Sequence, residues 1–547
     1  MRPRGWLGVS LAVAVVAALS LSSSPSRSSG AVARSTTLTV AIPGRFAGCY
    51  YYAKDTSASL RALLDLIRPS AFENKPNGEL SGAPGPIAQA ELVSLTPQKV
   101  VYSLDTSYAW SNGAPFNGLD LERWFQEARA QPTSLADGYR KISAFDVSSA
   151  LDQVTVTFAT PYSDWPMLFR DVSERTVGPS CTLSALARQP SLGPYVLRSI
   201  SANTARLDVN PAWKAQTPGY EHVVITTDAV ARAITNRSYV DYRYGIVPFD
   251  LMRLTNDGSL NGRISTSNGL LAVEYSPRRA TTEQLAVRQF LSYAINRQVV
   301  DDQVLGPTTY NSGIAASVLV TQGTLRYPGA LGVAPIDQST ASMSSTVPSS
   351  IGVDCVACAA PILAAAGYVK RGGVWRSLSG APLTIRLGVG TAPYDRHVAA
   401  YVAGQWRVQG VVVGDVTELS DVAVAHALAK GAIDAGILTI DTAVVPGFTA
   451  RQFTGTNFGD TFDAGWRSVL VDQWYAAALS TFNPVAAEAS YNSIDQYVTT
   501  QAWERPLFTQ PSIVTWSNDV FGVVESNYLQ GMIDQVPSWG YTPPKFK

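Results

Sequence analysis

The alternation of apolar and polar residues is clearest in one stretch near residue 110. The run KVVYSLD at 99–105 mixes β-branched, aromatic and polar residues and predicts a strand. Asn112-Gly113 follows, a pair that tolerates positive φ in a tight turn. Asn117 can then cap a helix, with Asp120 near its positive end and Trp124-Phe125 beginning the buried face. The stretch therefore predicts a strand, a turn and a capped helix.

A second helix is predicted from a one-sided apolar stripe later in the chain. Its apolar residues are Leu285, Val287, Phe290, Leu291, Ala294 and Ile295. Because they recur at helical spacing, one face of this helix should be buried.

The N-terminal segment has the three parts of an export signal. Arg2 and Arg4 precede the apolar run WLGVSLAVAVVAALSL, and a Ser-rich stretch leads to the small residues at 31–33. We expect export through the Sec route, with residues 1–33 removed. The run is nearly long enough to span a bilayer, so an uncleaved membrane anchor is the alternative. No Cys follows it closely, which argues against lipid attachment, and no later segment is apolar and long enough to span a membrane.

Length and charge narrow the class of protein. With 547 residues the chain is too long for one ordinary core, and we expect about two to four domains. Lys+Arg and Asp+Glu are equal at 42 each, and basic runs are limited to short pairs such as Arg278-Arg279, which argues against nucleic acid as a partner. The 12 Trp and 24 Tyr include amphipathic rings suited to a cleft around a small ligand, although most should fill cores.

The four cysteines suggest disulfides rather than a metal site, because an exported protein with an even count usually pairs them. Cys355 and Cys358 lack the setting of a thioredoxin-like or zinc motif, so a local disulfide or two buried thiols is expected there. Cys49 and Cys181 are candidates for a second bridge.

Candidate catalytic and metal-binding residues are scarce. The only histidines are His222, His397 and His426, and none has a second ligand at helical or hairpin spacing. The sequence contains no nucleophile elbow, zinc-protease motif, P-loop or dinucleotide fingerprint. We therefore predict no catalytic residues, no metal and no cofactor, and treat each His as a surface or packing residue.

Six segments follow one another in an order typical of a known family. The stretch YAWSNGAPFNGLDLERWFQ resembles that family's W, D/N-G, P and D signature, with Asn117-Gly118 where Thr-Ala is usual. SLGPYVL resembles its G-T-G-P-Y segment, with Leu192 in place of Thr and Trp213 at a later aromatic position. The six segments are 108–126, 152–168, 191–225, 270–304, 361–411 and 504–523. The chain thus resembles the peptide/nickel type (family 5) solute-binding proteins of ABC importers, in an actinobacterial form.

The resemblance implies an α/β fold: a two-lobed periplasmic-binding-protein type II clam with an extra inserted domain. Lobe I would comprise residues 35–60, 192–267 and 500–547. The inserted domain would span 61–191, and lobe II 268–499.

The resemblance also implies a function. The protein would be an exported, extracytoplasmic monomer that captures peptides or a related small solute by hinge closure. It would deliver the solute to ABC permease subunits in the membrane. The alternatives are a transport-independent solute sensor or interaction protein on the same fold, and, as a third choice, a hydrolase.

Six residues are predicted to bind ligand. In the family a carboxylate that pairs with the amino terminus of a peptide follows a strand resembling 433–438, and Asp441 is the nearest carboxylate here; the alternative is a solvated loop acid. Tyr50, Tyr51 and Tyr52 follow the first strand, TLTVAIP, at the edge where ligands bind in open α/β sheets. Glu274 or Tyr275 should be their counterpart in lobe II.

Overall fold

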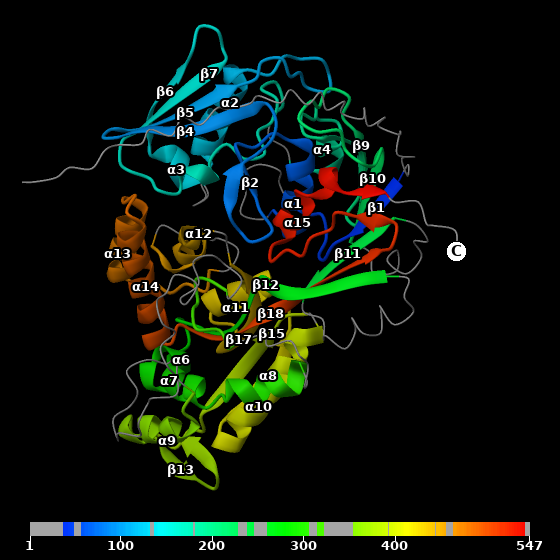
Figure 1. Ribbon diagram of the computed structural model, residues 1–547. Helices are drawn as coiled ribbons and strands as arrows, with labels where there is room; N and C mark the ends of the chain where they lie inside the picture. The colour runs from blue at the N-terminus through cyan, green and yellow to red at the C-terminus, as the bar shows by residue number, and fades with distance from the viewer. Residues whose placement is uncertain are drawn as a thin grey trace, which may run out of the picture.

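Figure 1 shows a computed structural model of the chain, in which a large sheet joins two lobes and a third part lies above one of them. The structure describes residues 37–48, 56–131, 136–178, 181–227, 238–244, 260–305, 314–321, 354–391, 393–442, 445–455 and 463–541.

Ten strands form one continuous sheet. Their order is β16-β15-β17-β12-β18-β11-β1-β10-β9-β8. The bounds are β1 (Thr37–Ala41), β8 (Tyr195–Ile200), β9 (Thr204–Val209), β10 (His222–Thr226), β11 (Tyr239–Tyr244), β12 (Leu260–Tyr275), β15 (Thr384–Val389), β16 (Val412–Glu418), β17 (Ala435–Asp441) and β18 (Glu504–Ser517). The predicted first strand is thus β1, and it lies near one end of the sheet.

The two long strands β12 and β18 connect the lobes. They run antiparallel from the pair Leu260–Ser517 to the pair Glu274–Glu504. Strands β11, β1, β10, β9 and β8 lie on one side of them and belong to lobe I, whereas β17, β15 and β16 lie on the other side and belong to lobe II. The predicted boundary after residue 267 falls within β12, and the boundary after residue 499 falls at the end of a helix. The domain limits remain predictions.

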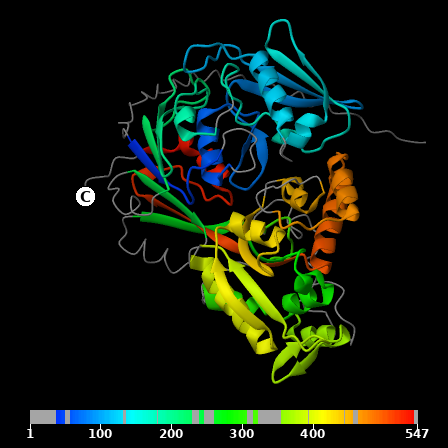
Figure 2. The same ribbon diagram turned by 180° about the vertical axis from the view of Figure 1, so that it is seen from behind.

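Helices cover the sheet in both lobes (Figures 1 and 2). Those of lobe I are α1 (Ala58–Ile67), α4 (Leu183–Leu186), α15 (Leu529–Ile533) and η5 (Val536–Ser538). Those of lobe II are α6 (Ala280–Glu283), α7 (Leu285–Tyr293), α8 (Arg297–Leu305), α9 (Val356–Ala365), α10 (Pro393–Gln409), α11 (Asp421–Ala429), α12 (Pro446–Ala450), η4 (Arg451–Phe453), α13 (Val469–Leu479) and α14 (Pro484–Thr500). Small two-stranded sheets pair β2 (Phe72–Asn74) with β3 (Leu80–Gly82), β13 (Val369–Arg371) with β14 (Val374–Arg376), and β19 (Val520–Phe521) with β20 (Gly540–Tyr541).

The apolar stripe predicted at 285–295 is confirmed as α7 and the turn after it. Val287, Phe290 and Leu291 are fully buried in the core of lobe II, as are the two residues that follow the helix. Leu285 differs, because it begins the helix and keeps about a third of its surface exposed.

The third part is built on the predicted strand, turn and capped helix. Its antiparallel sheet has the order β4-β5-β7-β6, with bounds β4 (Ile87–Leu95), β5 (Gln98–Leu104), β6 (Ile142–Val147) and β7 (Gln153–Phe158). Its helices are α2 (Gly118–Ala130), α3 (Asp137–Arg140) and, in the chain returning to lobe I, η2 (Trp165–Met167). The cap of α2 is confirmed: Asn117 Oδ1 accepts from the N–H of Leu119, and Asp120 accepts from the N–H of Asn117, each at 3.0 Å. Gly113 has φ +85° in the predicted turn.

The Gly-Pro turn at 193–194 joins this part back to lobe I. The N–H groups of Leu192 and Gly193 donate to the carbonyl of Ile67 at 2.9 and 3.1 Å. A Cβ at position 193 would lie 2.5 Å from the carbonyl oxygen of Leu66, so a side chain there would collide with the end of α1. Glycine is required at this position because two backbone segments meet closely.

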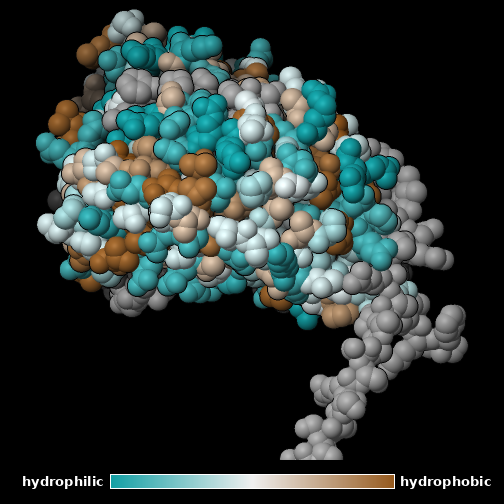
Figure 3. Space-filling view, turned by 90° about the horizontal axis from the view of Figure 1, so that it is seen from above, coloured by the Kyte–Doolittle hydropathy of each residue, from teal (hydrophilic) through white to brown (hydrophobic). Residues whose placement is uncertain are grey.

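Seen from above, apolar residues lie in separate small groups among hydrophilic ones (Figure 3). This pattern is expected for a face in contact with water. Among the helices that the structure describes, none is long and apolar enough to cross a membrane.

Candidate functional site

Asp441 lies at the end of β17, opposite Gly269 of β12. Its side chain is exposed to solvent. Even so, surrounding protein atoms displace enough water to raise the pKa of the Asp441 carboxyl, and the charge of Arg61 lowers it in part. Asp441 of lobe II thus lies within reach of the charge of Arg61.

Arg61 is the lobe I cation whose charge acts on Asp441. It lies on α1, and its Nη2 donates to the carbonyl of Thr56 at 2.9 Å. The side chain is exposed, yet burial lowers the pKa of Arg61, and the charge of Arg451 lowers it further while that of Asp441 opposes the change. Charges from both lobes thus act on one another.

Arg451 adds a second cation on the lobe II side. It begins η4, and its guanidinium carbon lies 4.6 Å from the centre of the Phe448 ring. Arg451 also acts on Tyr162 of the third part, whose pKa is raised well above its usual value by burial and by Asp164. The charge of Arg451 thus acts on groups of both lobe I and the third part.

The third part touches lobe II directly. The N–H of Ser163 donates to the carbonyl of Leu479 at 2.8 Å, and Ser163 Oγ donates to the carbonyl of Ala478 at 3.3 Å. The helix α13, which ends at Leu479, lies beneath the third part in both ribbon views. These contacts join the third part to lobe II.

Two further carboxyl groups lie near Asp441, at the starts of α10 and α11. Asp395 Oδ1 accepts from Thr439 Oγ1 and Gln510 Nε2, each at 3.3 Å. Burial and the neighbouring Asp421 raise the pKa of Asp395 to about 7, and burial raises the pKa of Asp421 to about 6, with the charge of Asp441 adding to the effect. Asp395, Asp421 and Asp441 thus form a group of neighbouring carboxyl groups in lobe II.

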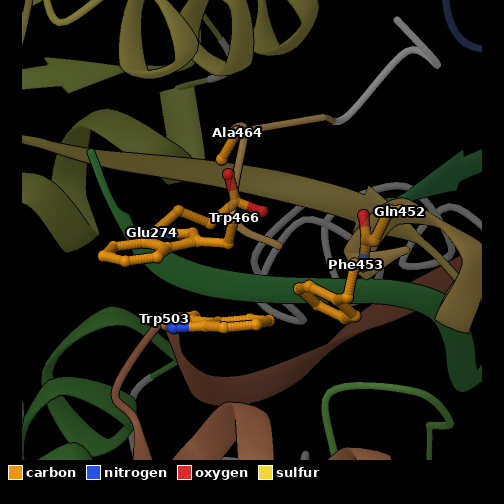
Figure 4. A pocket seen from close by; sticks show the side chains of 6 residues that line it. All are labelled: Glu274, Gln452, Phe453, Ala464, Trp466 and Trp503. Carbon is orange, nitrogen blue, oxygen red and sulfur yellow. The ribbon is translucent and has the colours of Figure 1, made fainter. Parts of the chain in front are cut away.

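Glu274 lines a small cavity next to η4. The cavity is lined by Glu274, Gln452, Phe453, Ala464, Trp466 and Trp503 (Figure 4). The indole rings of Trp466 and Trp503 stack with their centres 5.5 Å apart and 10° between their planes. Burial raises the pKa of Glu274 to about 8, with the charge of Asp463 adding to the effect.

Tyr275 does not line this cavity. Tyr275 is fully buried in the core of lobe II, and its hydroxyl lies 3.0 Å from Ser292 Oγ. Residues 50–52 lie outside the described residues, as does Cys49. Cys355 and Cys358 form a disulfide, and Cys181 is disulfide-bonded.

Sequence reasoning missed Arg61, Arg451 and the aromatic walls of the cavity. Arg61 had a weak signal, because it is the only charged residue in the first half of a strongly apolar helix. Trp466 and Trp503 are 37 residues apart in the chain, and no signal in the sequence pointed to their pairing. Among the described residues, no group of three or more His, Cys, Asp or Glu side chains is placed to hold a metal ion.

The known proteins that this chain resembles in sequence are bacterial solute-binding proteins. A family profile described as "Bacterial extracellular solute-binding proteins, family 5 Middle" matches residues 88–457. The oligopeptide-binding protein OppA of Mycobacterium tuberculosis (strain H37Rv) is 24% identical over 193 residues. That match spans 32% of this chain and about a third, 32%, of the relative's length.

Solved structures share the fold across nearly the whole chain. The periplasmic EDTA-binding protein EppA aligns with a TM-score of 0.80 at 20% identity, covering 93% of this chain and 97% of EppA. The oligopeptide-binding protein AppA from Bacillus subtilis, in complex with a nonapeptide, aligns with a TM-score of 0.75 at 12% identity, covering 94% and 100%. The predicted two-lobed α/β fold is confirmed.

Proposed function

The chain belongs to the bacterial extracellular solute-binding proteins of family 5, and on that premise we propose that it captures short peptides between its lobes for delivery to an ABC permease. Proteins of this family work outside the cytoplasm as the binding components of ABC importers. They bind their solutes without transforming them, which agrees with the scarcity of catalytic motifs in the sequence.

One observation carries the choice of peptides: charges of both signs from the two lobes lie close enough to act on one another. Asp441 would accept the amino terminus of a peptide, while Arg61 and Arg451 would accept its carboxyl terminus. A zwitterionic ligand would then bridge the lobes and favour the closed form, because it contacts both lobes only when they are together. The linking strands β12 and β18 would bend as the lobes move.

Glu274, Tyr275 and residues Tyr50, Tyr51 and Tyr52 complete the proposed ligand set. The tyrosines follow β1, at an edge of the sheet where ligands bind in open α/β folds. Glu274 lines the cavity beside η4, and Tyr275 would act by supporting that wall from the core.

The proposal is tested by thermal unfolding of the protein, freed of bound solute, with a library of di- to pentapeptides. Some members should raise the melting temperature, because a ligand that binds only the folded state stabilises it. Metal chelates and sugars serve as parallel sets. If chelates shift the melting temperature and peptides do not, the solute is a chelate. If no solute class does, the sensor or interaction role gains support. Hydrolysis of a peptide by the protein alone would favour an enzyme.

Replacing Asp441 by asparagine should weaken binding of a peptide found in that screen by on the order of 2 kcal/mol or more, because a buried ammonium would lose its counter-charge. Calorimetry should show that the wild type discriminates strongly against the N-acetylated peptide and that Asp441→Asn does not. The matched control is Asp415→Asn, an exposed acid of β16. Equal affinity of the wild type for both peptides would rule out the amino-terminus role of Asp441.

We also propose that the mature protein begins at Arg34 and carries no lipid. The mass of the intact protein isolated from its native host should equal that of residues 34–547. A mass that includes residues 1–33 would show that the N-terminal segment is a membrane anchor instead.

A further inference from the structure

Two glutamates face each other inside lobe II. Glu274 of β12 and Glu504 of β18 are register partners in an antiparallel pair, so their side chains lie on the same face of the sheet. Their exposed fractions are 2% and 0%. Glu274 Oε2 and both carboxyl oxygens of Glu504 have no hydrogen-bond partner. Buried carboxyl groups without partners are costly unless they are neutral or paired with a cation.

The surroundings of this pair are acidic. The charge of Asp463 raises the pKa of Glu274. The charges of Glu274 and Asp495 raise the pKa of Glu504. Arg467 is paired with Asp463 at 2.5 Å. Within the described part of the chain, the charges that act on the two glutamates are therefore acidic.

The buried cation Arg288 is engaged elsewhere. Its guanidinium carbon lies 4.4 Å from the centre of the Trp466 ring, and its N–H groups donate to backbone carbonyls, those of Thr282 and Gln501 among them. Arg288 and the stacked Trp503 ring thus both pack against the Trp466 indole.

The cavity beside Glu274 has the size and walls of a small cation site. It has room for about one water molecule, which is also the size of an ammonium head group. Figure 4 shows the parallel indoles of Trp466 and Trp503 and the ring of Phe453 around it. The Glu274 carboxylate with an aromatic ring beside it suits a cationic nitrogen. Two carboxylates provide too few oxygens for the six to eight ligands of Ca²⁺.

We propose that Glu274, with Glu504 opposite it on β18 and the rings of Trp503 and Phe453 beside it, binds a primary ammonium group in this cavity. The group would come from the captured solute or from a free small amine. If the captured solute supplies the ammonium group, the site rests on the proposed function and gives the protein a preference for lysine-like solutes. This source is favoured by position, because Phe453 and Arg451 belong to the same short helix, η4, and the charge of Arg451 acts on Arg61 of lobe I.

The first arm of the test measures melting temperature in methylammonium chloride, at about pH 8, against sodium chloride of equal ionic strength. The wild type should be more stable in methylammonium, because the amine binds only the folded state. Glu274→Gln and Glu504→Gln should lose this increase while remaining folded, since glutamine has the same shape without the charge. Glu525→Gln, an exposed acid, should retain it. Tetramethylammonium, too large for the cavity, should have no effect.

The second arm compares a lysine-containing dipeptide with its norleucine counterpart. If the solute supplies the ammonium, the wild type should prefer lysine by at least about tenfold, and Glu274→Gln should bind both equally. An increase in melting temperature with methylammonium but no lysine preference would identify a free amine as the ligand. Equal melting temperatures in both salts and no lysine preference would overturn the site.

The two proposals can fail separately. If library peptides bind but neither arm responds, the ammonium site is wrong and the peptide function stands. If methylammonium raises the melting temperature and no peptide binds, the site stands and the peptide function fails. Asp441→Asn should leave the methylammonium effect unchanged in either case.

Discussion

Replacing Asp354 by alanine should lower the free energy of unfolding by about 3–5 kcal/mol, because it leaves two buried guanidinium groups without their counter-charge. Asp354 Oδ1 accepts from Arg297 Nε at 2.7 Å and from Arg505 Nη2 at 2.5 Å. Both arginine side chains are fully buried, and burial together with the charge of Arg297 lowers the pKa of Arg505 to about 9. The Asp354 carboxylate is shared by Arg297 of α8 and Arg505 of β18, and it therefore holds these two elements together.

The change is measured by urea unfolding at neutral pH. The matched control is Glu418→Gln, which removes an exposed ion pair with Arg396 in the same lobe and should cost no more than about 1 kcal/mol. If Asp354→Ala costs no more than this control, the two arginines do not depend on Asp354.

The second large effect concerns pH and Glu274. Its pKa is raised from 4.5 to about 8 in the folded protein, so between these values the folded state binds more protons than the unfolded state. The contribution of Glu274 to the free energy of unfolding is therefore complete below about pH 4.5 and is lost as the pH rises toward 8. The loss should be on the order of 2–4 kcal/mol, because the buried carboxyl must ionise beside Glu504.

Glu274→Gln should flatten this decline and should be more stable than the wild type at about pH 8 in the absence of amines. The measurement is the urea midpoint of both proteins at several pH values from about 5 to 8. Asp395 and Asp534 also have pKa values raised to about 7, so the difference between the two proteins is the informative quantity. The urea midpoint of the control Glu525→Gln should change with pH as that of the wild type does. If the urea midpoint of Glu274→Gln falls with pH as steeply as that of the wild type, the prediction is wrong.

Local signals in the sequence were sufficient for single elements. The cap of α2 was predictable because Asn117 and Asp120 bond backbone groups within three residues of themselves. The buried face of α7 was predictable because helical periodicity decides which residues share a side. The order of the six segments was enough for the family and its two-lobed fold. Each of these depends on neighbours in the chain or on order along it.

The ligand site stays a prediction, and only part of it could be proposed from the sequence. The resemblance pointed to Asp441, because the family's anchoring carboxylate follows a strand like that at 433–438. The cations whose charges act near it lie on α1 and η4, nearly four hundred residues apart, so only the folded chain brings them together.

Patterns along the chain were enough for single elements and for the family, and the N-terminal charges and apolar run predict an export segment. Which charges meet depends on the folded arrangement. Glu274 and Glu504 face each other because the ladder of β12 and β18 sets their register over 230 residues of intervening chain. Trp466 and Trp503 stack because a loop and a strand end converge on the same side of lobe II. Such pairings depend on long-range packing, which no local pattern encodes.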